Sequence, residues 1–296
     1  MTEEVQRVEN PPSLPARRQD GHKGDYGRVL IVGGSRGMVG AVALAANAAL
    51  RGGAGLVTFA APETMQLAVA GLCPCATSVP LACGADGELA AEAVRQFYQA
   101  AGPMDVLAVG PGMDVGTRQQ DLVRAALEQG KPLVVDADGL NNLVYLARWP
   151  AARRCPLILT PHPGEFARLT GRSVREIQAD REGSAAAAAR QWGAAGAPEA
   201  PLAVLLKGAG TVITDGRRLR VNATGNPGMA TGGSGDVLTG LVAALLAQGL
   251  AVFDAASLAA HLHGRAGDLA AEGLSQAGLI ASDLLDFLPR AMKEIA

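Results

Sequence analysis

The segment Arg28-Val-Leu-Ile-Val32 is followed by an Ala-rich stretch over residues 39–51 and then by Gly55-Leu-Val-Thr-Phe59. The two short runs are apolar at nearly every position, which is typical of strands buried on both faces of a parallel sheet. The stretch between them has the length and composition of a helix. Because parallel strands need such a crossover, the sequence predicts a β-α-β unit here.

The same alternation continues along the chain to about residue 206. It predicts further buried strands at residues 105–109, 132–135, 157–159 and 202–206, and helices at about 117–129, 139–147, 164–170 and 174–195. Buried strands that alternate with helices indicate a doubly wound α/β fold. We therefore expect a mostly parallel sheet with helices on both faces, arranged in three layers.

The pattern changes after residue 210. Residues 211–214 and 219–221 flank Asp215-Gly216, a dipeptide that favours a tight hairpin turn. A small antiparallel hairpin is therefore expected at an edge of the sheet. Ala-rich segments near 234–247, 253–272 and 280–294 predict three closing helices.

Composition limits the class of protein. The chain has 296 residues, a formal net charge of −2 and four cysteines without a C-x-x-C pair. This charge balance argues against nucleic acid or an anionic membrane surface as a partner. The acidic N-terminus lacks the features of a signal peptide, and residues 237–253 are too short to span a membrane. We expect a cytoplasmic enzyme with a flexible N-terminal arm over residues 1–22 and one domain over residues 23–296.

The motif most informative about chemistry is Asn222-Ala-Thr-Gly-Asn-Pro-Gly-Met-Ala-Thr-Gly-Gly-Ser-Gly-Asp236, directly before a predicted helix. Its glycines allow close backbone approach, and a helix N-terminus favours bound anions such as phosphate. Asp236 lies in the first helical turn, where the helix dipole favours the ionised carboxylate, so it could accept a proton from a hydroxyl. Alternatively, Ser234 caps the helix and Asp236 only complements the dipole.

Two further motifs follow predicted parallel strands, and ligands bind at the carboxyl ends of such strands. In Leu206-Lys-Gly-Ala-Gly-Thr211, Lys207 could place a cation near a nucleotide phosphate, or it could be a solvated lysine in an ordinary turn. In Thr160-Pro-His-Pro-Gly-Glu165, His162 could orient a substrate, or it could simply pack between the prolines.

The remaining strand ends are less specific. Asp138 is expected to cap its helix, whereas Asp136 could face a metal or a catalytic water. The loop after residue 32 lacks G-x-G-x-x-G spacing and no acid ends the next strand, which disfavours a hydride-transfer enzyme. His261 and His263 are two residues apart on a predicted helix, hence on different faces, so we interpret them as structural.

Together these segments resemble the ADP-dependent NAD(P)H-hydrate dehydratases, a branch of the ribokinase-like superfamily. The resemblance extends from Lys23 to about Leu288. It is carried by the following motifs: Lys23-Gly-Asp-Tyr-Gly27, Gly110-Pro-Gly112, Asp136-Ala-Asp-Gly-Leu-Asn141, Pro161-His-Pro-Gly-Glu165, Lys207-Gly-Ala-Gly-Thr211 and the stretch from Asn222 through Asp236.

The resemblance implies repair of hydrated NADH or NADPH by dehydration, with ADP (possibly ATP) and Mg²⁺ as cofactors and no metal ligands assigned. It implies nucleotide contacts from Lys207, Gly208, Ala209, Gly210, Thr211 and Gly235, and contacts to the hydrated dinucleotide from Ala41, Gly112, His162 and Asp236. It also implies a homotetramer. Because only about 22 residues precede the match, we expect no epimerase activity from this sequence.

In the resulting hypothesis, Asp236 accepts the proton of the ring hydroxyl as the terminal phosphoryl group of the nucleotide transfers to it, and phosphate then leaves. Glycine amides and Mg²⁺ stabilise the transferring charge. Two other functions stay open: a kinase of the same fold that phosphorylates a vitamin alcohol, and a non-catalytic module that senses adenine nucleotides.

Overall fold

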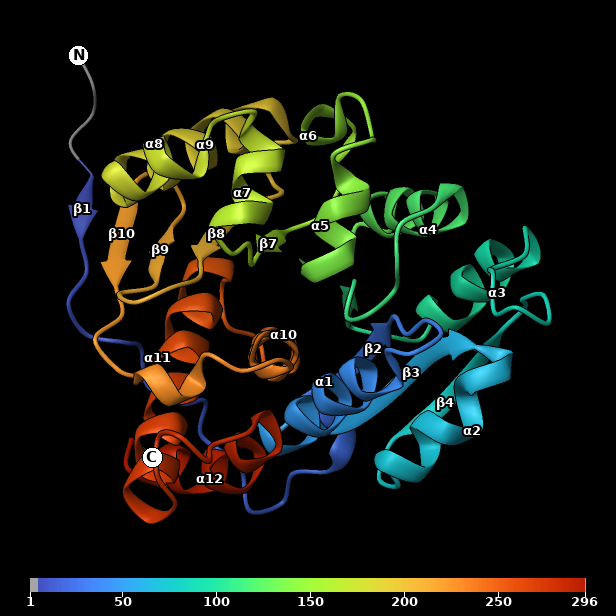
Figure 1. The fold of residues 1–296 in the computed structure, drawn as a ribbon, viewed down its shortest axis with the longest axis horizontal. Helices are drawn as coiled ribbons and strands as arrows, with labels where there is room; N and C mark the ends of the chain where they lie inside the picture. The colour runs from blue at the N-terminus through green and yellow to red at the C-terminus, as the bar shows by residue number, and fades with distance from the viewer. Residues whose placement is uncertain (1–4, 296) are drawn as a thin grey trace.

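The computed structural model describes residues 5–295 of the chain and contains a ten-stranded sheet with helices on both faces (Figure 1). The strands are β1 (Gln6–Arg7), β2 (Arg28–Val32), β3 (Leu56–Pro62), β4 (Thr77–Leu81), β5 (Val106–Val109), β6 (Leu133–Val135), β7 (Leu157–Leu159), β8 (Leu202–Leu206), β9 (Val212–Thr214) and β10 (Arg218–Val221). The helices are α1 (Val39–Arg51), α2 (Glu63–Leu72), α3 (Glu92–Ala101), α4 (Thr117–Glu128), α5 (Ala137–Leu143), α6 (Trp149–Ala152), α7 (Pro163–Thr170), α8 (Val174–Ala179), α9 (Arg181–Ala195), α10 (Ser234–Ala247), α11 (Val252–Gly273) and α12 (Ala281–Lys293).

The strand order is β1-β10-β9-β8-β7-β6-β5-β2-β3-β4, and the strands from β2 to β8 are mutually parallel. The chain runs outward from β2 through β3 to β4, then returns to the other side of β2 with β5. The order of winding therefore reverses between β2 and β5. β9 pairs antiparallel with β8 and with β10, which confirms the predicted hairpin at the edge of a mostly parallel sheet.

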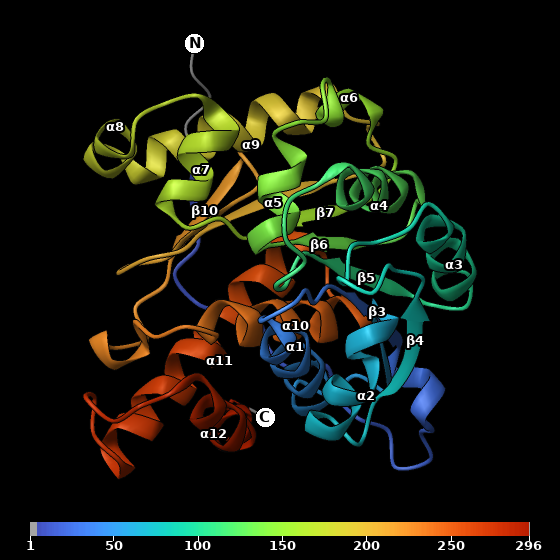
Figure 2. The same cartoon turned by 45° about the vertical axis from the view of Figure 1, so that its right-hand side comes forward.

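Alternate residues of each central strand enter opposite layers. Val29 and Ile31 pack in one core with α1, α10, α11 and α12, whereas Leu30 and Val32 pack in a second core with α3, α4 and α9. A strand covered on both faces has no polar side, which explains why these strands are continuous apolar runs. Figure 2 shows the two layers of helices on either side of the strands.

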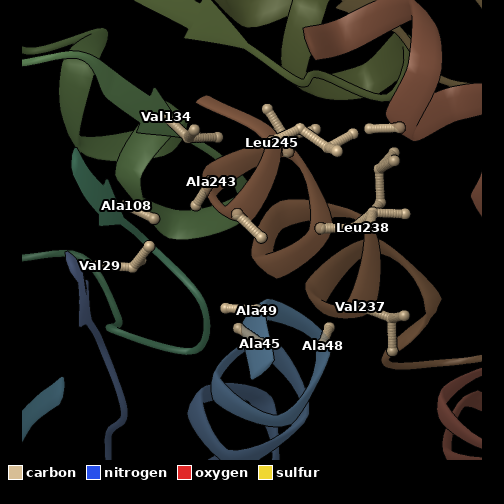
Figure 3. Close-up of a cluster of buried hydrophobic side chains, with 14 of the residues drawn as sticks. Val29, Ala45, Ala48, Ala49, Ala108, Val134, Val237, Leu238, Ala243 and Leu245 are labelled. Carbon is tan, nitrogen blue, oxygen red and sulfur yellow. The ribbon is translucent and has the colours of Figure 1, made fainter. Parts of the chain in front are cut away.

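Small residues set the distance between α1 and α10. Ala45, Ala48 and Ala49 of α1 face α10, and Val29 of β2 and Ala108 of β5 lie near the same interface (Figure 3). A Cβ added to Gly240 of α10 would collide with the backbone carbonyl of Ala45. The small alanine side chains therefore allow α1 and α10 to pack closely. α10 contacts β2 and β5, the two strands between which the strand order reverses.

The sequence prediction missed residues 63–101, where the structure has α2, β4 and α3. β4 is the edge strand Thr77-Ser-Val-Pro-Leu81, and only Leu81 of it is buried. Because an edge strand tolerates polar residues and proline, it lacks the apolar run by which the other strands were found. The helix predicted over 174–195 is divided at Asp180, whose side chain caps α9 by accepting the N–H of Gly183.

The predicted arm over residues 1–22 pairs with the sheet near its start; residues 1–4 lie outside the described part. Gln6 and Arg7 form β1, which pairs in parallel with β10. Arg220 Nε donates to the carbonyl of Glu9 at 3.3 Å, and Val8 packs against the core. Residues 6–9 of the predicted arm therefore contact the domain, because backbone hydrogen bonds hold a segment that has little apolar surface.

Candidate active site

The sequence motifs gather at one edge of the sheet. The loops after β2, β5, β6, β7 and β8 all leave the carboxyl ends of parallel strands. Two of these loops, after β2 and β5, flank the point where the strand order reverses. They are joined by a hydrogen bond from the backbone N–H of Gly34 to the carbonyl of Pro111, at 2.9 Å. Ligands of open α/β sheets bind in the crevice at such a reversal.

The Gly-rich segment ends in a tight bend that starts α10. Gly233 is the N-cap residue with a φ of 92°, a conformation that favours glycine. The hydroxyl of Ser234 donates to the carbonyl of Met229 at 2.9 Å, so the alternative in which Ser234 caps the helix is wrong. The helix thus begins without a side-chain cap, and its first N–H groups stay available for an anion.

Asp136 links this bend to the loop after β8. Its carboxylate is 1% exposed; Oδ1 accepts from Lys207 Nζ at 2.6 Å and Oδ2 accepts from Thr239 Oγ1 at 2.6 Å. Lys207 Nζ also lies 3.7 Å from Glu165 Oε2. Asp136 was expected to face a metal or a water. The structure instead places both of its oxygens on protein donors, which keeps a buried carboxylate paired.

His162 is fixed at the start of α7, as the proline-locked loop predicts. It is the N-cap residue, and its Nδ1 accepts the N–H groups of Gly164 at 3.0 Å and of Glu165 at 3.3 Å. The backbone N–H of His162 donates in return to Glu165 Oε2 at 2.7 Å. Burial and the nearby Lys207 lower the pKa of His162, so the ring is neutral near pH 7 with its proton on Nε2.

Asp236 differs electrostatically from what the sequence predicted. The helix dipole was expected to favour its ionised form, yet burial raises the pKa of Asp236 to about 7, and the charge of Asp136 adds to that rise. Lys207 acts in the opposite direction and only partly offsets it. The expectation failed because the fold buries the Asp236 carboxyl group and places other carboxyl groups near it. A pKa near 7 matches what a general base needs at neutral pH.

Burial and neighbouring charges also oppose each other at Glu165 and Lys207. Burial raises the pKa of Glu165 to about 7, and Lys207 moderates that rise. Burial would lower the pKa of Lys207, but the carboxylates of Asp136 and Glu165 outweigh burial and raise it. The site therefore contains one firmly protonated ammonium among carboxyl groups that can hold or release protons near neutral pH.

Ala41 and Gly112 meet on the other side of the crevice. A Cβ added to Gly112, whose φ is 58°, would lie 3.0 Å from Ala41 Cβ and 2.9 Å from the carbonyl of Met38. The buried Asn142 donates to the carbonyl of Asp114 at 2.7 Å and so holds this loop in place. The glycine is needed here because the loop after β5 touches the start of α1.

Asp138 does not cap α5 as predicted. Asp136 occupies the N-cap position, and Asp138 lies in the first turn. Its carboxylate accepts the backbone N–H of Asp114 and the side chain of Asn141, each at 3.0 Å. Asp138 therefore helps to hold the loop that carries Gly112.

The predicted site residues fall into two groups. His162, Lys207, Gly235 and Asp236 surround Asp136, since a Cβ on Gly235 would lie 3.3 Å from Lys207 Nζ. Ala41 and Gly112 form the second group. The bend before α10 adjoins α1 as well, because a Cβ on Gly233 would lie 2.6 Å from Leu44 Cδ1. Both groups thus border the N-terminal end of α10.

The segment from Gly208 to Thr211 extends from the first group as an exposed loop. Arg181 braces it from α9, donating through Nη2 to the carbonyls of Leu206 at 3.0 Å and of Lys207 at 3.3 Å. Thr211 Oγ1 donates to the carbonyl of Gly208 at 3.0 Å. Gly208, Ala209 and Gly210 are exposed, and protein contacts hold the conformation of the loop.

Sequence reasoning missed Thr239, Arg181 and Asn142 as parts of the site. Only Thr239 has a signal in the sequence, because it follows Asp236 by three residues and so lies on the same side of α10. The contacts of Arg181 and Asn142 join segments that are distant in sequence. His263 is structural, as predicted: its Nε2 donates to the carbonyl of Ser234 at 2.9 Å, and burial lowers its pKa to about 4.

Within residues 5–295 no group of three or more His, Cys, Asp or Glu side chains is placed to hold a metal ion. The carboxylate at the centre of the site is already bound by Lys207 and Thr239. These residues do not form a protein-only metal cage.

The same described residues contain no helix with the length and apolar character needed to cross a lipid bilayer.

Comparison with known proteins gives consistent matches. The family profile described as NAD(P)H-hydrate dehydratase matches residues 29–290. The bifunctional NAD(P)H-hydrate repair enzyme Nnr of Moorella thermoacetica is 48% identical over 285 residues, which is 95% of this chain and 52% of that protein. Nnr of Thermofilum pendens is 39% identical over 97% of this chain and 53% of its own. The chain therefore spans about half the length of the curated relatives it matches.

Among solved structures, the ADP/ATP-dependent NAD(P)H-hydrate dehydratase of Bacillus subtilis, co-crystallized with ATP/Mg²⁺, is similar with a TM-score of 0.80 and 33% identity. The match covers 96% of this chain and 95% of that one. A hydroxyethylthiazole kinase from Pyrococcus horikoshii has a TM-score of 0.59 at 18% identity over 90% of this chain and 89% of its own, which is a likeness of fold. The expected ribokinase-like architecture is thereby confirmed.

Proposed function

This chain belongs to the NAD(P)H-hydrate dehydratase family, and from that premise we propose that it dehydrates hydrated NADH and NADPH back to the normal cofactors at the expense of ADP. The observation that carries the proposal is the position of Asp236. Its carboxyl group, with a pKa near 7, lies in the uncapped first turn of α10, where it interacts with the charge of the partly buried Lys207. A base next to an anion site is what phosphoryl transfer to a hydroxyl requires.

The proposed reaction has two stages. The ring hydroxyl loses its proton to Asp236 and attacks the terminal phosphorus of ADP, whose bond to the bridging oxygen breaks to release AMP. The ring nitrogen lone pair then expels phosphate, and a proton leaves the adjacent ring carbon to restore the dihydronicotinamide. The sum is hydrated cofactor plus ADP giving cofactor, AMP and phosphate. Phosphorylation is needed because hydroxide is a poor leaving group.

The two groups of residues divide the ligands between them. Lys207, Gly208, Ala209, Gly210, Thr211 and Gly235 form the proposed nucleotide side, where exposed amides and an ammonium suit phosphates. Ala41, Gly112 and His162 form the proposed dinucleotide side, with Asp236 between them. The His162 ring is neutral and its Nε2 lies 3.4 Å from Glu165 Oε1, so we propose that it orients a substrate without adding charge.

We propose that Mg²⁺ enters with the nucleotide. This ion usually binds through substrate phosphates and few carboxylates, which agrees with the lack of a metal cage among the described residues. When bound it would neutralise phosphate charge. The residues of the chain bind and orient the two ligands, and Asp236 accepts the proton.

The direct test follows the near-ultraviolet absorbance of the dihydronicotinamide ring after mixing the protein with hydrated NADH, Mg²⁺ and either ADP or ATP. We expect absorbance to appear with ADP and one phosphate to be released for each cofactor restored. A stable phosphoester of an alcohol substrate would instead identify a kinase, and nucleotide binding without any turnover would identify a sensing module. Either result would contradict the proposal.

Two finer expectations accompany the function. We propose a cytoplasmic location, supported by the free thiols of Cys73, Cys75, Cys83 and Cys155. We also propose a homotetramer, supported by exposed apolar side chains such as Leu67, which is 80% exposed on α2. Light scattering of the purified protein tests the second of these.

A further inference from the structure

The first turn of α10 is connected to the rest of the site by one buried hydroxyl. Thr239 is fully buried, and its Oγ1 lies 2.6 Å from Asp136 Oδ2 and 3.1 Å from the carbonyl of Gly235. The hydroxyl has a single hydrogen, and the charged carboxylate at the shorter distance is the stronger acceptor. Thr239 therefore donates to Asp136 and links α10 to the end of β6.

Asp136 also contacts Lys207, at the start of the loop after β8. Its other oxygen, Oδ1, lies 2.6 Å from Lys207 Nζ. A carboxylate that is 1% exposed keeps its charge only when its oxygens are paired and hydrogen-bonded. Lys207 supplies the opposite charge and Thr239 the remaining hydrogen bond. The orientation of the carboxylate, and through it of the ammonium, depends on both donors.

The link lies directly beneath the proposed reacting groups. A Cβ built on Gly235 would lie 3.3 Å from Lys207 Nζ and 3.6 Å from Asp136 Oδ2. The ion pair of Lys207 and Asp136 therefore lies next to the turn at which we propose that the nucleotide phosphate binds. The pair lies against the backbone of Gly235, and Asp236 is the next residue. A small rotation of the Asp136 carboxylate would move the Lys207 ammonium relative to both.

We propose that Thr239 is a positioning residue for the reaction: its hydroxyl orients the Asp136 carboxylate, which holds the Lys207 ammonium in place beside Gly235 and Asp236. This inference rests on the proposed function for its kinetic part. Thr239 itself is fully buried, so its hydroxyl does not reach the surface of the site. Its effect passes through Asp136, so it should change both the binding of nucleotide phosphates and the rate of the chemical step.

The test compares Thr239→Val, which replaces the hydroxyl with a methyl of similar size, with Thr239→Ser, which keeps the hydroxyl. We expect Thr239→Val to lower kcat by about 10-fold to 100-fold, the scale for small misplacements of catalytic groups, and to raise the dissociation constant of ADP. Thr239→Ser should restore both values. The ADP constant is measured by calorimetry and does not depend on the dehydration reaction.

A matched control is Thr58→Val on β3. Thr58 is also a buried threonine whose hydroxyl bonds another side chain, Thr77, at 2.7 Å, but it lies on the β4 side of the sheet. It should lose a buried side-chain hydrogen bond with unchanged kcat and ADP affinity. If Thr239→Val does not fold, Thr239→Ala, which adds no atom, takes its place in the comparison.

The outcomes separate the two proposals. A folded Thr239→Val protein with wild-type kcat and wild-type ADP affinity would overturn the positioning role, as would a Thr239→Ser protein that is as impaired as Thr239→Val. If the wild-type chain binds ADP but restores no cofactor, the proposed function fails. The ADP affinities of the three proteins then still decide whether Thr239 positions Lys207.

Discussion

Lys207 Nζ lies 2.6 Å from Asp136 Oδ1, so an ion pair joins the end of β8 to the end of β6 across the end of β7. The side chain of Asp136 is 1% exposed and that of Lys207 is 19% exposed. The pair is therefore largely removed from water, and its geometry sets the charge distribution beneath Gly235 and Asp236.

The pair makes a prediction about stability. Lys207→Met should lower the free energy of unfolding by about 3 to 5 kcal/mol, because removing one partner leaves a buried charge without compensation. The double variant Lys207→Met/Asp136→Asn should recover part of that loss, since no unpaired charge remains. Urea unfolding of the wild type and the two variants measures both values. A double variant no more stable than Lys207→Met would contradict this account of the pair.

Asp236→Asn tests the proposed base. The amide has nearly the same shape but cannot accept the hydroxyl proton, so kcat should fall by more than about 10²-fold. ADP should still bind, because the amides and Lys207 are unchanged. The control Asp215→Asn, in the hairpin turn between β9 and β10, should leave kcat unaltered. Near-normal turnover by Asp236→Asn would refute its role.

The pH dependence of the rate follows from the same carboxyl group. With the pKa of Asp236 near 7, kcat/KM for the free enzyme should fall about tenfold per pH unit below that value, since only the ionised form accepts a proton. In Asp136→Asn the acidic limb should shift to lower pH, because the negative charge of Asp136 raises the pKa of Asp236. An acidic limb that does not shift in this variant would show that the two carboxyl groups do not interact.

Asp236 also links pH to the stability of the ligand-free protein. Its folded-state pKa of about 7 lies above the value of about 4 expected in the unfolded chain. Folding therefore favours the protonated form, and the associated stability is fully present below about pH 4 and is lost as the pH rises toward 7. Asp236→Asn should consequently be more stable than the wild type at pH 8, by on the order of 1 kcal/mol after solvent screening.

The measurement for this prediction is thermal unfolding of both proteins at several pH values. The difference in stability should shrink toward zero under acidic conditions, where Asp236 is protonated and resembles the amide. A constant difference across the whole range would indicate that the substitution acts through packing and not through charge.

Two neighbouring glycines should respond differently to substitution. Gly233 has a φ of 92° and a Cβ there would lie 2.6 Å from Leu44 Cδ1, so Gly233→Ala should cost about 1 to 3 kcal/mol of stability. A Cβ on Gly232 would meet no atom within 4 Å. Gly232→Ala should therefore fold normally, and any change it causes should appear in the dissociation constant of ADP. Equal stability of the two variants would contradict the conformation of the bend.

The sequence by itself determined the parallel core of this protein. Strands such as Leu30-Ile31-Val32 and Leu202 to Leu206 are apolar on both sides, and only a sheet covered by two helical layers buries such runs. It also determined that the segments with His162 and Lys207 would lie at one edge, because they follow the carboxyl ends of the parallel strands β7 and β8. The edge strand β4 escaped detection, since its exposure removes the apolar signal.

Only the tertiary structure decided the electrostatics of the site. Local sequence predicted that the helix dipole keeps Asp236 ionised. The fold instead raises the pKa of Asp236, first by burying it and then by placing Asp136, Asp138 and Glu165 near it. Likewise, Asp136 pairs with Lys207 and Thr239, residues 71 and 103 positions away. Burial and charge interactions depend on distances in space. A local sequence pattern does not give the distance between residues that are so far apart along the chain.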